Sequence, residues 1–130
     1  MANVSILDHK AWLAKAANDL KVVRLCLKEQ DPLDIAVYHT QQAAEKALKA
    51  FLVFHTKQIR KTHDLLFLTD QCIVIDFSFV QIQAYACALN AYATYARYPD
   101  DFFTIDYEEA KAAYKKALAI IDFITKRLPK

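Results

Sequence analysis

Four polar side chains recur at helical spacing in one segment of the chain and are suited to holding an anion. They are His39, Gln42, Lys46 and Lys49, at i, i+3, i+7 and i+10, opposite a row of alanine, threonine and phenylalanine side chains. An imidazole, an amide and two ammonium groups together can bind a phosphate or pair with acidic groups. The alternative is a solvated helix surface, with an ordinary i,i+4 ion pair between Glu45 and Lys49.

Two further polar groups complete the candidate site. Arg97 ends an uncharged stretch and is followed by Asp100, while His63 lies in the segment Lys61-Thr-His-Asp64. If these groups approach the first, Arg97, the lysines and the histidines would face an anion together, and Asp100 would hold Arg97 or contact a metal-bound phosphate. The predicted ligand-binding residues are His39, Gln42, Lys46, Lys49, His63, Arg97 and Asp100.

Each of these residues also has a structural interpretation. His39 is equally suited to a hydrogen bond with a neighbouring helix, and Asp64 to the N-terminus of a helix. Arg97 is equally suited to an ion pair with Asp100 or Asp101 that fixes the loop. A cluster of tyrosines at positions 85, 92, 95 and 98 favours packing over base stacking.

No spacing typical of catalysis or metal binding stands out. Ser–His–Asp and zinc-ligand patterns are missing, and Asp100 with Asp101 would supply too few oxygen ligands for a metal. Cys26, Cys72 and Cys87 show no CxxC spacing and lie among apolar residues, which indicates buried, reduced thiols. We therefore expect no catalytic residue, no metal and no cofactor.

Composition favours a single all-α domain covering residues 1–130. The chain is 55% hydrophobic and contains no glycine, which argues against β-sandwiches, Rossmann units and P-loops. The net charge of +2 is too small to indicate a nucleic-acid partner, but a basic stretch (45–63) precedes an acidic one (64–109), which suits self-association or a charged partner. The N-terminus does not resemble a signal peptide, and polar residues interrupt the uncharged stretch 77–96, so we expect a cytoplasmic protein without a membrane span.

Apolar periodicity predicts five helices in an up-and-down bundle of four to five helices. Their expected ranges are roughly 8–28, 32–55, 62–72, 78–98 and 107–128. Asp31 with Pro32, Ser78 and Asp106 are the expected N-terminal caps of the second, fourth and fifth helices. Residues 73–79 alternate as a strand would, but a lone strand would have no partner, so a loop is expected there.

Four short motifs, in this order, resemble the HEPN domain family. They are Asn18-Asp19-Leu20, the segment His39-x-Gln-Gln-Ala-Ala-Glu-Lys-x-x-Lys-Ala50, Thr62-His63-Asp64-Leu65 and Arg97-Tyr98-Pro99-Asp100. The resemblance implies a helical bundle that forms homodimers and is often encoded beside a minimal nucleotidyltransferase, in some cases as a toxin–antitoxin pair. It also implies nucleotide binding, and in many members metal-independent ribonuclease activity through an Arg and a later His that are separated by four to six residues.

This chain departs from the ribonuclease motif, because Phe102, Phe103 and Thr104 occupy the positions where that His would follow Arg97. We therefore predict a non-catalytic nucleotide- or phosphate-binding HEPN module, homodimeric, that partners a minimal nucleotidyltransferase in a toxin–antitoxin-like pair. One alternative is a divergent ribonuclease that acts on RNA through Arg97 with His39 or His63. The other is a purely structural protein-interaction bundle.

Overall fold

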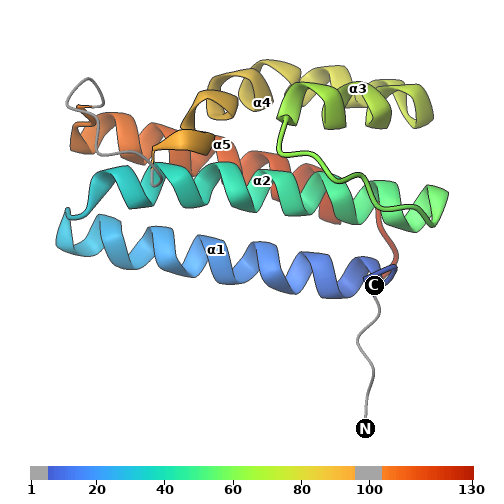
Figure 1. Cartoon of the computed structure of the whole chain (residues 1–130), viewed down its shortest axis with the longest axis horizontal. Helices are drawn as coiled ribbons and strands as arrows, with labels where there is room; N and C mark the ends of the chain where they lie inside the picture. The colour runs from blue at the N-terminus through green and yellow to red at the C-terminus, as the bar shows by residue number, and fades with distance from the viewer. Residues whose placement is uncertain (1–5, 96–103) are drawn as a thin grey trace, which may run out of the picture.

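A computed structural model describes residues 6–95 and 104–130, and these residues form a bundle of helices (Figure 1). Its elements are α1 (His9–Glu29), α2 (Leu33–Thr56), α3 (Leu65–Ile75), the 3₁₀ helix η1 (Phe77–Ile82), α4 (Gln83–Asn90), the 3₁₀ helix η2 (Ala91–Thr94) and α5 (Tyr107–Thr125). No strand occurs in the part of the chain that the structure describes. The predicted all-α bundle is confirmed.

The helix α2 is the centre of the bundle and contacts all the other α-helices. In Figure 1, α1 and α2 run antiparallel, α5 lies along α2, and α3 and α4 follow one another across the other side. Five alanines of α2 are fully buried, which lets neighbouring helices approach closely: Ala36, Ala43, Ala44, Ala47 and Ala50. Phe51 of α2 packs against the buried ring of Phe79, with ring centroids 4.4 Å apart.

The first and last helices begin where their sequences predict. Asp8 precedes α1 and its side chain accepts a hydrogen bond from the Lys10 amide, while Asp106 precedes α5 and accepts one from the Glu109 amide at 2.8 Å. The two longest helices both end at a residue in the left-handed conformation. These residues are Gln30 after α1 (φ 56°) and Lys57 after α2 (φ 57°).

Other predicted helix starts are wrong. The helix α2 begins at Leu33 with Pro32 at the N-cap position and no side-chain cap, so Asp31 does not cap it. Ser78 is not a cap, because Asp76 takes that role and accepts hydrogen bonds from the amide and hydroxyl of Ser78. These bonds, above all the one from the hydroxyl, lower the pKa of Asp76. The predicted helix 78–98 is divided, up to residue 95, into η1, α4 and η2.

The third helix begins and ends three residues later than its sequence predicts, and it is tied to the fourth. Asp64 caps α3 by accepting from the amides of Leu66 and Phe67. Asn90, the last residue of α4, donates to Asp64 Oδ1 at 3.2 Å and accepts from the Leu65 amide at 2.9 Å. The loop expected over residues 73–79 is wrong, because α3 continues to Ile75 and η1 begins at Phe77.

The cysteines are only partly as predicted. All three thiols are free, and Cys26 and Cys72 are buried, but Cys87 is exposed on the outer side of α4, so its predicted burial is wrong. Within the described ranges, no helix is both long and apolar enough to cross a membrane.

Candidate functional site

The polar face of α2 packs against α1 and the loop before α3, and it is organised around two buried carboxylates. The first is Asp19 of α1, which is 6% exposed. One of its oxygens lies 2.7 Å from His39 Nδ1 and the other lies 2.6 Å from Lys46 Nζ. His39 and Lys46 are two helical turns apart on α2, so one carboxylate on the neighbouring helix joins them. We call these three residues the Asp19 cluster.

The second carboxylate is Glu45 of α2, which is 3% exposed. Its oxygens lie 2.9 Å from Lys49 Nζ and 3.0 Å from His63 Nδ1, in the loop before α3. Gln41 Nε2 approaches the same carboxylate at 3.4 Å and donates to the His63 carbonyl at 2.9 Å. Gln42 Nε2 donates to Gln41 Oε1 at 2.7 Å, which completes the Glu45 cluster of these five residues.

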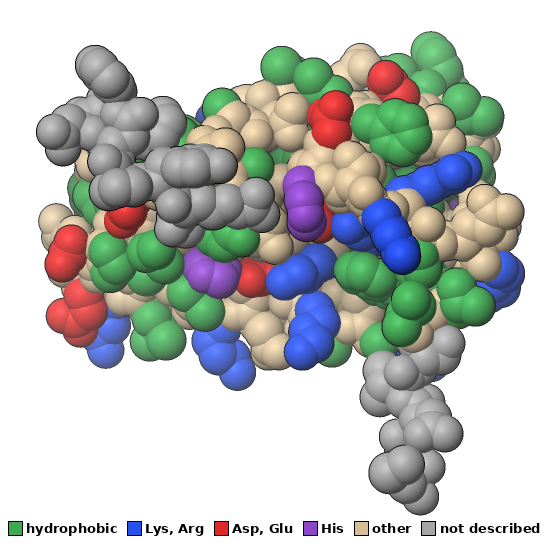
Figure 2. Space-filling model, viewed as in Figure 1, with side chains coloured by type: hydrophobic (Ala, Val, Ile, Leu, Met, Phe, Trp, Pro, Cys, Tyr) green, Lys and Arg blue, Asp and Glu red, His purple; other side chains and the backbone are tan. Residues whose placement is uncertain are grey.

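The two clusters balance their own charge. When the imidazoles are neutral, Lys46 and Lys49 offset Asp19 and Glu45. A phosphate would therefore not meet an excess of positive charge there, and its binding would depend on hydrogen-bond donors that the carboxylates leave available. Figure 2 shows histidine, basic and acidic side chains gathered across the middle of one face, with hydrophobic side chains around them.

The two histidines are held in a defined orientation. An ionised carboxylate only accepts hydrogen bonds, so each imidazole donates to it through Nδ1–H and keeps Nε2 for another partner. The side chain of His63 is 58% exposed, and those of His39 and Lys46 are 26% and 23% exposed. These three side chains can thus contact a ligand from solvent. Lys49, with a side chain only 8% exposed, also lies 5.6 Å from the ring centroid of Trp12 and is less available.

Five of the seven predicted site residues belong to these clusters: His39, Gln42, Lys46, Lys49 and His63. The other two, Arg97 and Asp100, lie outside the described residues. The polar face of α2 is not a plain solvated surface, since Lys49 and Glu45 are buried. The hydrogen bond of His39 to a neighbouring helix, the structural interpretation of that residue, is present.

Sequence reasoning missed the residues on which the site depends. Neither Asp19 nor Glu45 is among the predicted site residues, although both lie in motifs that resemble the HEPN family. A usable signal existed for both. Asp19 lies among the apolar positions Ala16, Leu20 and Val23 of α1, and Glu45 lies among alanines of α2, where an unpaired carboxylate would be costly.

No metal site accompanies the clusters. Within residues 6–95 and 104–130, no group of three or more His, Cys, Asp or Glu side chains is arranged to hold a metal ion. The imidazole and ammonium groups of the two clusters can supply hydrogen bonds and proton transfer.

Comparisons with known proteins identify the family. The HEPN domain model matches residues 9–128. A crystal structure of TT1696 from Thermus thermophilus superposes with a TM-score of 0.75 at 26% identity, over 92% of this chain and 98% of that one. The structure of ST0689, an archaeal HEPN homologue, gives a TM-score of 0.73 at 22% identity, over 92% and 97%. No curated protein sequence matches the chain. Because the HEPN domain model matches nearly its whole length, the chain belongs to the HEPN domain family.

Proposed function

We propose that this HEPN domain is a non-catalytic module that binds the phosphate of a nucleotide at its two carboxylate-centred clusters. The observation that carries the proposal is the orientation of His39 and His63. Each is held through Nδ1 by a buried carboxylate, and among the described residues Nε2 has no hydrogen-bond partner, so it can contact a ligand. Lys46 shares the Asp19 carboxylate with His39. Protonated imidazole and ammonium groups are strong donors to phosphate oxygens.

Calorimetry with ATP, ADP and AMP tests this proposal. We expect heat of binding with the wild type and weaker binding in His63→Gln, whose exposed side chain can be changed without opening the core. A lost charge-assisted hydrogen bond of about 1.5 kcal/mol would weaken binding roughly tenfold. Lys21→Gln is the matched control, because Lys21 is exposed and lies on α1 outside both clusters.

Two results would contradict the proposal. One is a wild type that gives no heat with any of the three nucleotides. The other is a His63→Gln protein that binds as tightly as Lys21→Gln. Arg97→Ala is a third test, because Arg97 is a predicted site residue, and we expect this change to weaken binding as well.

A divergent ribonuclease is the second candidate, and one observation favours it. A histidine whose Nδ1 is held by a buried carboxylate is the arrangement with which many enzymes orient a general base. His39 with Asp19 and His63 with Glu45 both have this form. Incubation with structured RNA separates the candidates: cleavage that is lost in both His39→Ala and Arg97→Ala supports the enzyme, and an inert wild type eliminates it.

We further propose that the domain is a cytoplasmic homodimer that partners a minimal nucleotidyltransferase in a toxin–antitoxin-like pair. Exposed apolar side chains on α3, η1 and α4 support a protein interface, and they include Phe67, Val74, Phe77, Val80 and Tyr85. We expect light scattering to give twice the chain mass, and Phe77→Glu to give a monomer, while a monomeric wild type would contradict this.

Co-purification with the adjacent gene product tests the partner. If the polar face of α2 were purely a protein-interaction surface, that complex would survive charge reversal of Arg97 but not of Lys46.

A further inference from the structure

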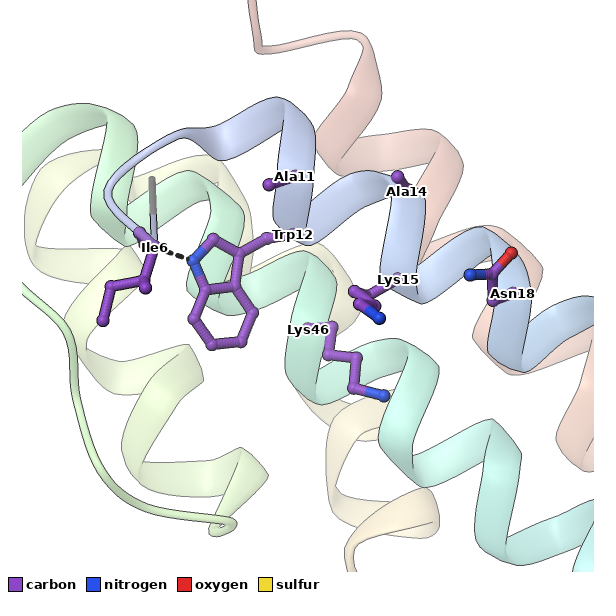
Figure 3. A pocket seen from close by; sticks show the side chains of 7 residues that line it. All are labelled: Ile6, Ala11, Trp12, Ala14, Lys15, Asn18 and Lys46. Carbon is purple, nitrogen blue, oxygen red and sulfur yellow. Dashed lines mark hydrogen bonds between the residues drawn. The ribbon is translucent and has the colours of Figure 1, made fainter. Parts of the chain in front are cut away.

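A pocket of about 660 Å³ opens beside the N-terminal half of α1 (Figure 3). Its lining residues are Ile6, Ala11, Trp12, Ala14, Lys15, Asn18 and Lys46. This volume lies within the range of about 300–1,000 Å³ that is usual for small-molecule sites. Except for Lys46, no lining residue belongs to the Asp19 or Glu45 cluster.

The apolar part of the pocket is built around Trp12. The indole Nε1 donates to the Ile6 carbonyl at 2.6 Å, and the Lys49 ammonium lies 5.6 Å from the ring centroid, so two contacts hold the ring in place. The side chains of Ala11 and Ala14 are small and leave room beside it (Figure 3). An apolar ligand body can therefore pack here without displacing a core residue.

The polar part of the pocket carries a single unbalanced positive charge. Figure 3 shows the side chains of Lys15 and Lys46 next to each other, with Asn18 one turn further along α1. Lys46 is paired with Asp19, whereas Lys15 forms no ion pair with any residue in the ranges 6–95 and 104–130. The single unpaired positive charge of Lys15 matches the charge of a monoanion, whereas one negative charge of a phosphate dianion would remain without a counter-charge. Asn18 offers an additional amide donor to the same head group.

We infer that this pocket binds an organic carboxylate with an apolar body, the body packed on Trp12 and the carboxylate held by Lys15 and Lys46. This site goes beyond the proposed phosphate site, since its ligand differs in charge and in its need for apolar contact. Burial of an acyl or aryl body supplies the affinity, and the ammonium groups select for the charged head.

The fluorescence of Trp12, the chain's single tryptophan, reports on the pocket directly. The full chain is titrated with octanoate, octanol and acetate. We expect a saturable change with octanoate, binding at least several-fold weaker with octanol, which lacks the charge, and no change with acetate, which lacks the apolar body. Equal binding of octanol and octanoate, or no saturable change with octanoate, would overturn the inference.

Two pairs of variants locate the ligand. Lys15→Gln should weaken octanoate binding by about two- to fivefold, the range for an exposed ion pair, and leave octanol binding unchanged. Its control is Lys21→Gln, on the same helix and outside the pocket. Ala14→Phe should fill the pocket and abolish binding, whereas Ala17→Phe, at another exposed position on α1, should not.

The inference fails if either variant behaves as its control does. Both alanine positions are exposed, so the variants should keep the wild-type unfolding temperature, which circular dichroism checks. This test can be distinguished from the test of the phosphate proposal. His63→Gln changes the Glu45 cluster but none of the residues that line the pocket, so it should not affect octanoate binding.

Discussion

Replacing Glu45 with glutamine should destabilise the domain far more than the loss of an ordinary helix ion pair. The Glu45 and Lys49 side chains are 4% and 8% exposed, and their charged atoms lie 2.9 Å apart. Glutamine keeps the shape but removes the charge. Among the described residues, the buried Lys49 ammonium then has an amide oxygen and the Trp12 ring as its partners. Removing one partner of a buried pair costs about 3–5 kcal/mol, and we expect the low end here, about 3 kcal/mol, because glutamine still accepts a hydrogen bond.

The assay is thermal and urea unfolding followed by circular dichroism. A loss of about 3 kcal/mol should lower the unfolding temperature by about 10 °C for a domain of this size. The matched control is Asp122→Asn, which breaks the i,i+4 pair of Asp122 with Lys126, whose side chains are 68% and 71% exposed. That change should cost less than about 1 kcal/mol.

A double variant separates pairing from simple loss of Glu45. Lys49→Met alone should be mild, because Glu45 keeps His63 and Gln41 as donors. Adding Lys49→Met to Glu45→Gln removes the buried ammonium that has lost its carboxylate. The double variant should regain at least about 1 kcal/mol in the free energy of unfolding. The reasoning is refuted if Glu45→Gln costs no more than Asp122→Asn, or if the effects of the two changes simply add.

Three other predictions follow from single residues. In the native protein, a thiol reagent at pH 8 should modify the exposed Cys87 rapidly. Cys72 should react only after unfolding, because it is buried and burial raises its pKa. Rapid reaction of both thiols would contradict the burial of Cys72. Asp64→Ala should cost about 1–2 kcal/mol in urea unfolding, since α3 loses its cap; an unchanged midpoint would count against the capping role. Burial and the hydrogen bond to Glu109 raise the pKa of Tyr92, so its contribution to stability is complete below about pH 10 and declines as pH rises further. Tyr92→Phe should therefore flatten the decline of stability above about pH 10.

The presence of five helical segments was readable from the sequence, because apolar residues recur with the helical period, but the division of the fourth segment into η1, α4 and η2 was not. The caps were readable only where no competitor was near. Asp106 caps α5 as expected, but Ser78 is preceded by Asp76, an ionised acceptor that binds the Ser78 amide and hydroxyl itself. A choice between two adjacent polar residues depends on the backbone geometry, which a sequence pattern does not specify.

The site was predictable on one helix and not across helices. The spacing of His39, Gln42, Lys46 and Lys49 correctly places them on one face of α2. Whether that face meets solvent or another helix depends on packing, and the partner of His39 and Lys46 is Asp19, at least 20 residues away in sequence. A local pattern could therefore indicate the donors but not the carboxylates that orient them.

The absence of glycine has a consequence for the reserve of stability in this domain. Gln30 and Lys57 adopt left-handed backbone angles that are unfavourable by about 1–2 kcal/mol for a residue with a Cβ atom. Glycine would remove that penalty in the folded state while adding about 0.4–1 kcal/mol of chain entropy to the unfolded state. Two single-residue changes at helix ends, outside both ligand sites, are therefore open to evolution or to engineering as routes to a more heat-resistant protein.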